Sequence, residues 1–183
     1  AIELFHNFTL IHDDIMDDAP IRRGKETVFK KWNSNIAILS GDTLFALAYQ
    51  YAQQADNVIL KDILSVFNQT AIEVCEGQQF DLNYETKDSV SVDEYINMIR
   101  LKTGVLFGAS LKIGALIGGA STSDADLLYD FGVNIGLGFQ LKDDLLDTFG
   151  NEIVFGKKNG GDIVSNKKTY LYIKALESAI DSD

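Results

Sequence analysis

Apolar residues recur at helical spacing along almost the whole chain. Ile2, Phe5 and Phe8 open the pattern, and similar stripes follow further on. Apolar residues at every third or fourth position are typical of amphipathic helices packed against a core. No convincing strand alternation appears. The pattern predicts an all-α protein with six helices, near residues 2–18, 34–55, 57–84, 92–119, 123–149 and 167–180.

Two of these predicted helices have recognisable start signals. Ser91 and Glu94 have the spacing of a capping box, and Ser123 stands ahead of an apolar run as a candidate cap. Two polar connections, 19–33 and 150–166, are longer than the ~2–8 residues usual between helices of a bundle. Each is basic and directly follows a cluster of aspartates. We therefore expect the chemistry at these two points.

The composition is that of an acidic globular protein. The 183 residues carry 16 Lys and Arg against 27 Asp and Glu, a net charge of −11. This charge disfavours partners such as nucleic acid or an anionic membrane. No apolar run approaches the ~20 residues that a membrane span needs, so we expect no stable membrane insertion. Cys75 is the single cysteine, which fits a reducing compartment such as the cytoplasm.

The two ends of the sequence read as the interior of a longer protein. The chain opens on Ala1 inside an amphipathic pattern, without an initiator Met or a capping residue, and it stops inside another helical pattern. We expect residues 1–183 to form a single domain that lacks N-terminal and C-terminal helices.

The first acidic cluster is Asp13-Asp14-Ile15-Met16-Asp17. Asp13 and Asp17 are four residues apart, so they share one helix face and lie ~6 Å apart along the axis. Like charges at this spacing destabilise a helix by a few tenths of a kcal/mol, which a divalent cation would offset. All-oxygen ligation suits Mg²⁺. For this motif alone, a solvated acidic helix end remains the alternative.

The same spacing recurs in Asp143-Asp144-Leu145-Leu146-Asp147, and Gln140 precedes it on the same face. Two facing clusters could hold several Mg²⁺ ions around one polyphosphate, while the basic connections neutralise the remaining charge. Lys102 and Thr103 place polar groups on an otherwise apolar helix face, where they could contact the same phosphate. The alternative for Lys102 is that its ammonium group reaches out to water.

Taken in order, these motifs make the chain resemble the trans-isoprenyl diphosphate synthases, also called polyprenyl synthetases. The resemblance spans nearly the whole chain. It runs through Asp13-Asp14-x-x-Asp17, Arg22-Arg23-Gly24, Gly41-Asp42, Gly77-Gln78-x-x-Asp81, Lys102-Thr103, Gln140 with Asp143-Asp144-x-x-Asp147, Gly156-Lys157, Asp162 and Lys167-x-Thr169. It implies the isoprenoid synthase fold, an antiparallel helical bundle around a central cavity with both aspartate clusters at its mouth. It also implies a cytoplasmic homodimer.

The resemblance implies a reaction in which an allylic diphosphate ionises, isopentenyl diphosphate attacks the carbocation and a proton is lost. Three Mg²⁺ ions per active site would activate the allylic diphosphate. Asp13, Asp17 and Asp143 would be ligands, and the remaining carboxylates would be ligands or water-mediated support: Asp14, Asp81, Asp144 and Asp147. Cationic side chains would hold the same diphosphate: Arg22, Lys102, Lys157 and Lys167. Arg23 and His6 would serve isopentenyl diphosphate, and Thr103 and Gln140 would stabilise the carbocation.

The chain departs from the family at several points. Glu26 and Phe29 stand where relatives often have Pro and His, and the family's N-terminal motif for isopentenyl diphosphate and its last helices are absent. Phe8 lies five residues before Asp13, about 7.5 Å down the helix axis. A bulky ring there would block a growing chain, and the resemblance implies a product of C15 or C20. The alternative is that Phe8 is ordinary core.

Four other functions stay open. Inside the same fold they are a longer-chain synthase, a terpene cyclase and a non-catalytic subunit of a heteromeric synthase. A cyclase normally replaces the second aspartate motif, and a non-catalytic subunit commonly loses one, whereas both are intact here. The fourth is a plain Mg²⁺- or Ca²⁺-binding bundle, which would bind metal without a diphosphate.

Overall fold

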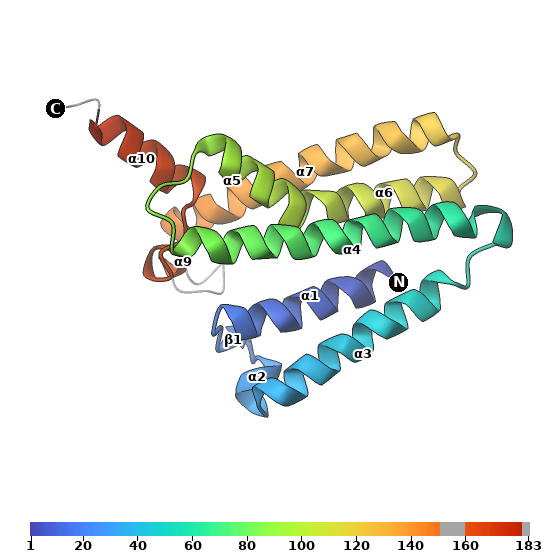
Figure 1. The fold of residues 1–183 in the computed structure, drawn as a ribbon, viewed down its shortest axis with the longest axis horizontal. Coiled ribbons are helices and arrows are strands. Elements are labelled where there is room, and N and C mark those ends of the chain that lie inside the picture. The colour runs from blue at the N-terminus through green and yellow to red at the C-terminus, as the bar shows by residue number, and fades with distance from the viewer. Residues whose placement is uncertain (151–159, 181–183) are drawn as a thin grey trace. The chain divides into compact units, whose positions relative to one another are not determined.

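The computed structural model describes residues 1–150 and 160–180. This part of the chain is mostly helical, as the apolar spacing predicts (Figure 1). The chain divides into two compact units, Ala1–Leu64 and Ser65–Asp183. No helix in the described ranges combines the length and the apolar character needed to cross a membrane.

The first unit is built on two long helices, α1 (Ile2–Met16) and α3 (Ser34–Ala52), which pack against each other. Between them lie a short hairpin and α2 (Val28–Lys31), and the unit ends in the first turns of α4 (Asn57–Glu85). Phe5 is fully buried, and the Phe8 ring lies 4.9 Å from the ring of Phe45 on α3. Asn33 caps α3, because its side chain accepts from Ile36 N at 2.9 Å.

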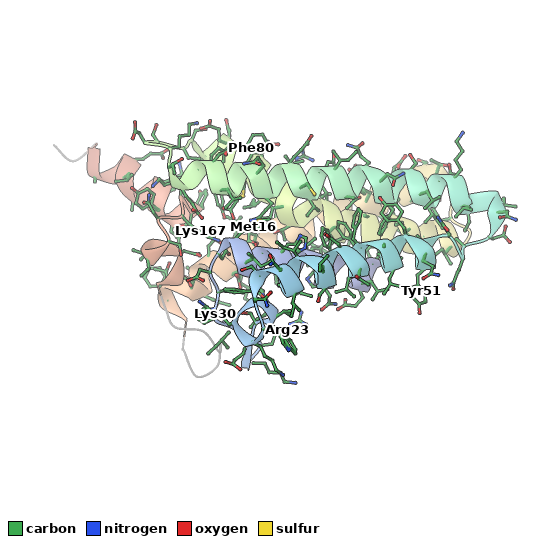
Figure 2. All side chains as sticks on the ribbon, turned by 60° about the horizontal axis from the view of Figure 1, so that its bottom comes forward. Met16, Arg23, Lys30, Tyr51, Phe80 and Lys167 are labelled. Carbon is green, nitrogen blue, oxygen red and sulfur yellow. The ribbon has the colours of Figure 1, made fainter. Side chains whose placement is uncertain are left out.

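The sequence prediction contained no strands and is wrong at one point, where the structure has a short hairpin. Strand β1 (Ile21–Arg22) pairs antiparallel with β2 (Lys25–Glu26). The two residues between them, Arg23 and Gly24, have φ of 53° and 73°. Positive φ at both central positions is what a two-residue type I′ hairpin turn requires. Arg23 and Lys30 lie at the hairpin end of this unit and Tyr51 at the other end (Figure 2).

The second unit contains the rest of α4 and two antiparallel helices, α6 (Val105–Ile117) and α7 (Thr122–Phe149), which lie side by side (Figure 1). Glycines allow the close approach of these two helices. A Cβ at Gly132 would lie 2.8 Å from Gly108 Cα, and one at Gly136 would lie 2.7 Å from Gly104 Cα. Both are below any normal contact distance, so the crossing requires glycine at these positions.

The predicted helix 92–119 is divided into three parts. It consists of α5 (Val92–Ile99), a π-helical turn η1 (Arg100–Gly104) and α6. The capping box of Ser91 and Glu94 is confirmed. The prediction of Ser123 as the cap of α7 is wrong, because the helix begins at Thr122 and the Ser121 hydroxyl accepts from Asp124 N at 3.1 Å.

Two further helices of the second unit lie within residues 160–180. Helix α9 (Gly161–Val164) precedes α10 (Tyr170–Ile180), which begins three residues later than predicted. A buried cluster joins α4, α5 and α10, and its members are Tyr84, Val90, Tyr95, Met98, Ile99 and Ile173. This core holds α5 against the end of α4, next to the second set of predicted site residues.

Candidate functional site

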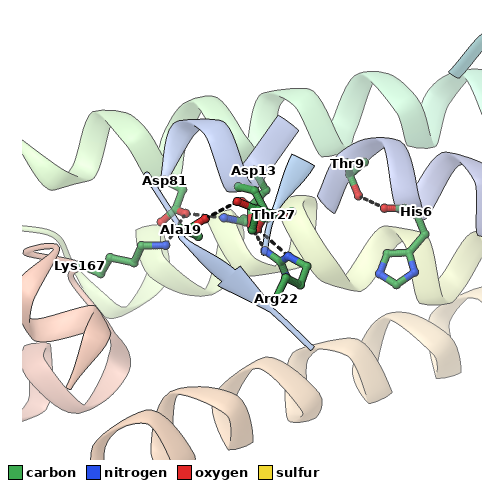
Figure 3. A network of polar contacts seen from close by, with 10 residues as sticks. His6, Thr9, Asp13, Ala19, Arg22, Thr27, Asp81 and Lys167 are labelled. Atoms are coloured by element: carbon green, nitrogen blue, oxygen red, sulfur yellow. Dashed lines mark hydrogen bonds and ion pairs between the residues drawn. The ribbon is translucent and has the colours of Figure 1, made fainter. Parts of the chain in front are cut away.

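Arg22 contacts two carboxylates of the first aspartate cluster. Its Nε donates to Asp14 Oδ1 at 2.6 Å, and its Nη2 donates to Asp13 Oδ2 at 3.0 Å (Figure 3). The hairpin places Arg22 there, and its base is closed by Thr27, whose Oγ1 donates to Ala19 O at 2.8 Å. Burial raises the pKa of Asp14, and the Arg22 hydrogen bond opposes this shift. The hairpin therefore brings a predicted phosphate-binding arginine to the predicted metal ligands.

The contact between His12 and Gly41 gives a structural reason for the Gly41-Asp42 motif. A Cβ at Gly41 would collide with the His12 ring, so glycine lets α3 lie directly against α1 at this point. His12 Nε2 lies 3.2 Å from Ile38 O and 3.7 Å from Asp42 Oδ1. These contacts fix the turn of α1 immediately before Asp13.

The other predicted residues of the first unit lie apart from the carboxylates or at the surface. Arg23 is exposed at the hairpin turn. His6 is partly exposed, with Nδ1 3.7 Å from Glu3 Oε2, and its carbonyl accepts from Thr9 (Figure 3). Phe8 packs in an aromatic group with Phe5 and Phe45, at 5.5 and 4.9 Å between ring centroids.

The second aspartate cluster lies on α7, and two of its side chains accept hydrogen bonds from protein donors. Asp144 is buried and accepts from the Tyr95 hydroxyl and, at 3.0 Å, from Gln140 Nε2. Asp147 is also buried, and its Oδ2 accepts from Asp162 N at 3.1 Å. Asp162, at the start of α9, thus lies beside Asp147.

The π-helical turn η1 carries Lys102 and Thr103 to two different helices. Lys102 Nζ lies 2.6 Å from Asp81 Oδ2 on α4, and Thr103 Oγ1 donates to Gln140 Oε1 on α7 at 3.0 Å. A Cβ at Gly77 would collide with the Lys102 backbone, so glycine allows α4 to lie against η1. Single π turns occur frequently at functional sites. The geometry thus brings four predicted site residues together in two pairs.

Lys167 also contacts Asp81, with Nζ 3.6 Å from Oδ2 (Figure 3). The preceding residue, Asn166, has φ of 56° and donates from Nδ2 to Glu85 O at 2.7 Å. Buried Lys168 donates to Asn166 Oδ1 at 2.7 Å and holds that conformation. Since Asp81 and Glu85 are four residues apart on α4, this anchor places Lys167 above Asp81.

Electrostatic repulsion couples the carboxylates of the second unit. Burial raises the pKa of Asp162 to about 6, repulsion from Asp147 adds to the shift, and Lys167 opposes it. Burial also raises the pKa of Asp144, which repulsion from Asp143 and Asp81 reinforces. Burial and the nearby Asp144 carboxylate raise the pKa of the Tyr95 hydroxyl, which keeps its proton. A cation would relieve this repulsion.

The donor set fits a metal that shares its coordination shell with phosphate. Within residues 1–150 and 160–180, no three His, Cys, Asp or Glu side chains form a cation site by themselves. Mg²⁺ usually takes one or two protein carboxylates and completes its shell with substrate phosphates and water. The aspartates Asp13, Asp17, Asp143 and Asp147 offer such oxygens. That the two clusters face each other across a cavity stays a prediction, and Lys157 lies outside the described residues.

Sequence reasoning missed two residues that the structure brings into these contacts, and it missed one contact of a residue that it had recognised. Tyr95 reaches Asp144 from 49 positions away, and His12 joins α1 to α3. Asp162 belongs to a recognised motif, but its contact with Asp147 was not predicted. Nothing in the spacing of the sequence pairs Tyr95 on α5 with Asp144 on α7. The sequence therefore gives no clear signal for this contact.

The whole chain, residues 1–183, matches the sequence profile of a family described as Polyprenyl synthetase. The chain belongs to the polyprenyl synthetase family. Among the related members, a geranylgeranyl diphosphate synthase of Methanosarcina mazei is 45% identical over 100% of this chain and 57% of its own length. A geranylfarnesyl diphosphate synthase of Natronomonas pharaonis is 38% identical over 99% of this chain and 54% of its own.

Solved structures of the family give the same fold. A crystal structure of a geranylgeranyl pyrophosphate synthase is 56% identical and superposes with a TM-score of 0.93, covering 96% of this chain and 54% of the other. The geranylgeranyl pyrophosphate synthetase of Pyrococcus horikoshii is 42% identical with a TM-score of 0.90, over 96% and 54%. The predicted isoprenoid synthase fold is confirmed. The chain spans just over half the length of these family members.

Proposed function

We propose that the protein is a prenyl diphosphate synthase. It condenses isopentenyl diphosphate with an allylic diphosphate (dimethylallyl, geranyl or farnesyl) and releases a trans-prenyl diphosphate of C15 to C20. The observation that carries the proposal is the arrangement around Asp81. Lys102 and Lys167 both contact this carboxylate, and the residue after Lys102 is bonded to Gln140 beside the second aspartate cluster. Cations, carboxylates and neutral oxygens are thus grouped as a diphosphate-ionising site requires.

The proposed metal is Mg²⁺, with three ions per active site. Asp13 and Asp17 would hold ions at the first cluster, and Asp143 would do so at the second. The remaining carboxylates would serve as further ligands or as support through water: Asp14, Asp81, Asp144 and Asp147. Bound Mg²⁺ supplies Lewis-acid stabilisation of the diphosphate leaving group.

The basic side chains bind the diphosphate of the allylic substrate. Arg22, Lys102 and Lys167 already lie against carboxylates, at 2.6 to 3.6 Å, so their charges are held at the site before substrate arrives. Lys157 acts with them. Because a preorganised cation needs little reorganisation during the reaction, these groups stabilise the charge that develops on the leaving diphosphate. Arg23 and His6 bind isopentenyl diphosphate.

The reaction proceeds by ionisation, condensation and elimination. The allylic carbon–oxygen bond breaks, and its electron pair leaves with the diphosphate. The C4 alkene carbon of isopentenyl diphosphate forms the new carbon–carbon bond, and the departed diphosphate takes the proton that is then lost. Thr103 and Gln140 stabilise the intermediate carbocation through their oxygen dipoles.

The assembly and the product length belong to the same proposal. The protein acts as a cytoplasmic homodimer, without stable membrane insertion or nucleic-acid partners. The ring of Phe8 lies among other aromatic rings on the tail side of Asp13 and limits the product. A longer-chain activity is the second candidate, because a relative at 38% identity is named a geranylfarnesyl diphosphate synthase. Both intact aspartate motifs favour an enzyme over a non-catalytic subunit.

The test is incubation of the full-length protein with radiolabelled isopentenyl diphosphate and each allylic primer. We expect labelled products that require Mg²⁺ and disappear with a chelator, with C15 or C20 as the longest chain. Chain length is read by chromatography after removal of the diphosphate. The absence of any Mg²⁺-dependent product with every primer overturns the proposal, whereas longer products support the second candidate.

A further inference from the structure

A continuous chain of side-chain hydrogen bonds runs through the second unit from the core to the proposed carbocation site. Buried Tyr95, only 2% exposed, donates from its hydroxyl to Asp144 Oδ2. Asp144 Oδ1 accepts from Gln140 Nε2 at 3.0 Å, and Gln140 Oε1 accepts from Thr103 Oγ1 at 3.0 Å. Three elements, α5, α7 and η1, are joined in this way.

The chemistry of these groups fixes the orientation of the Gln140 amide. A carboxylate oxygen accepts hydrogen bonds, and the Gln140 group that lies against Asp144 Oδ1 is the NH₂, with Nε2 at 3.0 Å. The Gln140 carbonyl is therefore turned toward Thr103. The single Thr103 hydroxyl hydrogen is donated to that carbonyl, so the Thr103 oxygen presents only its lone pairs to any other group.

Tyr95 is the end of this chain that is packed into the core. Its ring belongs to the buried cluster shared by α4, α5 and α10, whereas Asp144, Gln140 and Thr103 have rotatable polar ends. Rotation of carboxylate and amide groups about their last bond has broad, shallow minima, so neither side chain holds its own orientation. Without the Tyr95 hydroxyl, Asp144 loses the contact that holds it against Gln140. When Asp144 turns away, the Gln140 amide is no longer fixed with its oxygen toward Thr103.

We propose that Tyr95 is a positioning residue which, through Asp144, orients Gln140 and Thr103 so that their oxygen lone pairs face the allylic carbocation. This rests on the proposed synthase function. It assigns a role to a residue in the core of α5, seven positions before Lys102. It also assigns Asp144 a second role, because both of its oxygens accept from protein donors in addition to any part in metal binding.

The first test compares Tyr95→Phe with Tyr84→Phe in the full-length protein. Tyr84 lies in the same buried cluster, and its contacts are with the Phe80 ring and Lys87, not with Asp144. We expect Tyr95→Phe to lower kcat about 10- to 100-fold while KM for both substrates changes less than about twofold. Tyr84→Phe should leave kcat within about twofold. An unchanged kcat in Tyr95→Phe, or an equal loss in Tyr84→Phe, overturns the proposal.

The second test reads the orientation of Gln140 without any reaction. The side-chain amide resonances of Gln140 are assigned in a ¹⁵N-labelled sample by their loss in Gln140→Glu. We expect them to shift in Tyr95→Phe and to stay in Tyr84→Phe. If wild-type protein makes no product, the proposed function fails, and this measurement still decides the positioning role.

Asp144→Asn tests the same contact if Tyr95→Phe does not fold. An Asn side chain anchored by the Tyr95 hydroxyl turns its oxygen to Tyr95 and its amide hydrogens to Gln140, which must then rotate. The Gln140 resonances should therefore shift. Unchanged resonances would mean that the Asn oxygen faces Gln140 instead, so that Tyr95 sets no orientation, and the proposal falls.

Discussion

Lys102 Nζ lies 2.6 Å from Asp81 Oδ2 because Gly77, one turn earlier on α4, leaves room for the backbone of η1. Gly77 and Asp81 are four residues apart, so they share one face of the helix. A Cβ on that face would meet the backbone of Lys102 rather than a flexible side chain. The position of the Lys102 ammonium group therefore depends on the absence of a single methyl group.

Gly77→Ala should separate α4 from η1 and displace Lys102. We expect the free energy of unfolding to fall by about 1–3 kcal/mol, as for other overpacked sites. We expect kcat/KM to fall by a larger fraction of its wild-type value than the free energy of unfolding does. Urea unfolding and the synthase assay measure the two effects. The matched control is Gly114→Ala in α6, where an added Cβ meets nothing within 4 Å. That variant should be as stable as wild type or more stable, and equal damage in both would contradict this role of Gly77.

Asp13→Asn, in the first cluster, should lower turnover strongly while changing the stability of the protein little. The substitution removes a proposed Mg²⁺ ligand, so we expect kcat to fall about 100-fold or more. It also relieves repulsion among neighbouring carboxylates while an oxygen remains for Arg22, so the free energy of unfolding should change by less than about 1 kcal/mol. Thermal unfolding and steady-state kinetics give both values.

The control for Asp13→Asn is Asp18→Asn. Asp18 is the next aspartate beyond the motif, it pairs with Lys30 at 3.0 Å, and its φ of 48° is one that Asn adopts readily. We expect its turnover to stay near that of wild type. Parallel losses of stability and turnover in Asp13→Asn would argue for a structural role and against metal binding.

The sequence predicts the helices well because helical periodicity is a repeated, local signal. Helical periodicity does not reveal elements that depend on only one or two residues. The hairpin turns on Arg23 and Gly24, a pair less typical of such turns than Asn-Gly, and the π turn before α6 leaves the apolar spacing nearly intact. The cap of α7 was misplaced by two positions because Ser121 and Ser123 are both acceptable caps.

At the site, spacing predicts which side chains share a helix face, and it does so for Gln140 with Asp144 and for Gly77 with Asp81. It cannot predict partners from other helices, because those pairings are set by packing in three dimensions. Tyr95 and His12 were missed for this reason. The motifs of the family supplied the ligand and substrate assignments, which local spacing alone left open.

The stability of the metal-free protein should depend on the ionisation of Asp162. Its pKa is about 6 in the folded protein against an ordinary value of 3.8, so the folded state holds the proton more tightly than the unfolded state. Ionisation of Asp162 therefore costs stability as pH rises from about 4 through 6, by roughly 1 to 3 kcal/mol once complete. Below pH 4 both states are protonated and the effect vanishes.

Asp162→Asn removes this titration. In urea unfolding with a chelator present, we expect the variant to gain stability over wild type at pH 7 to 8 and to match it near pH 4. The comparison between the two proteins cancels contributions from carboxylates that do not interact with Asp162. A difference that does not vary between pH 4 and 8 would show that Asp162 ionises at its ordinary pKa.

Phe8→Ala should lengthen the product. The Phe8 ring stands on α1 about 7.5 Å from Asp13 along the axis, and its neighbours are the rings of Phe5, Phe45 and His12. Removing it opens the path of the hydrocarbon tail, so we expect chains at least one isoprene unit longer, resolved by chromatography. Phe45→Ala is the control, since it loosens the same aromatic group from α3. An unchanged distribution in Phe8→Ala, or equal lengthening in Phe45→Ala, would show that Phe8 does not set the chain length.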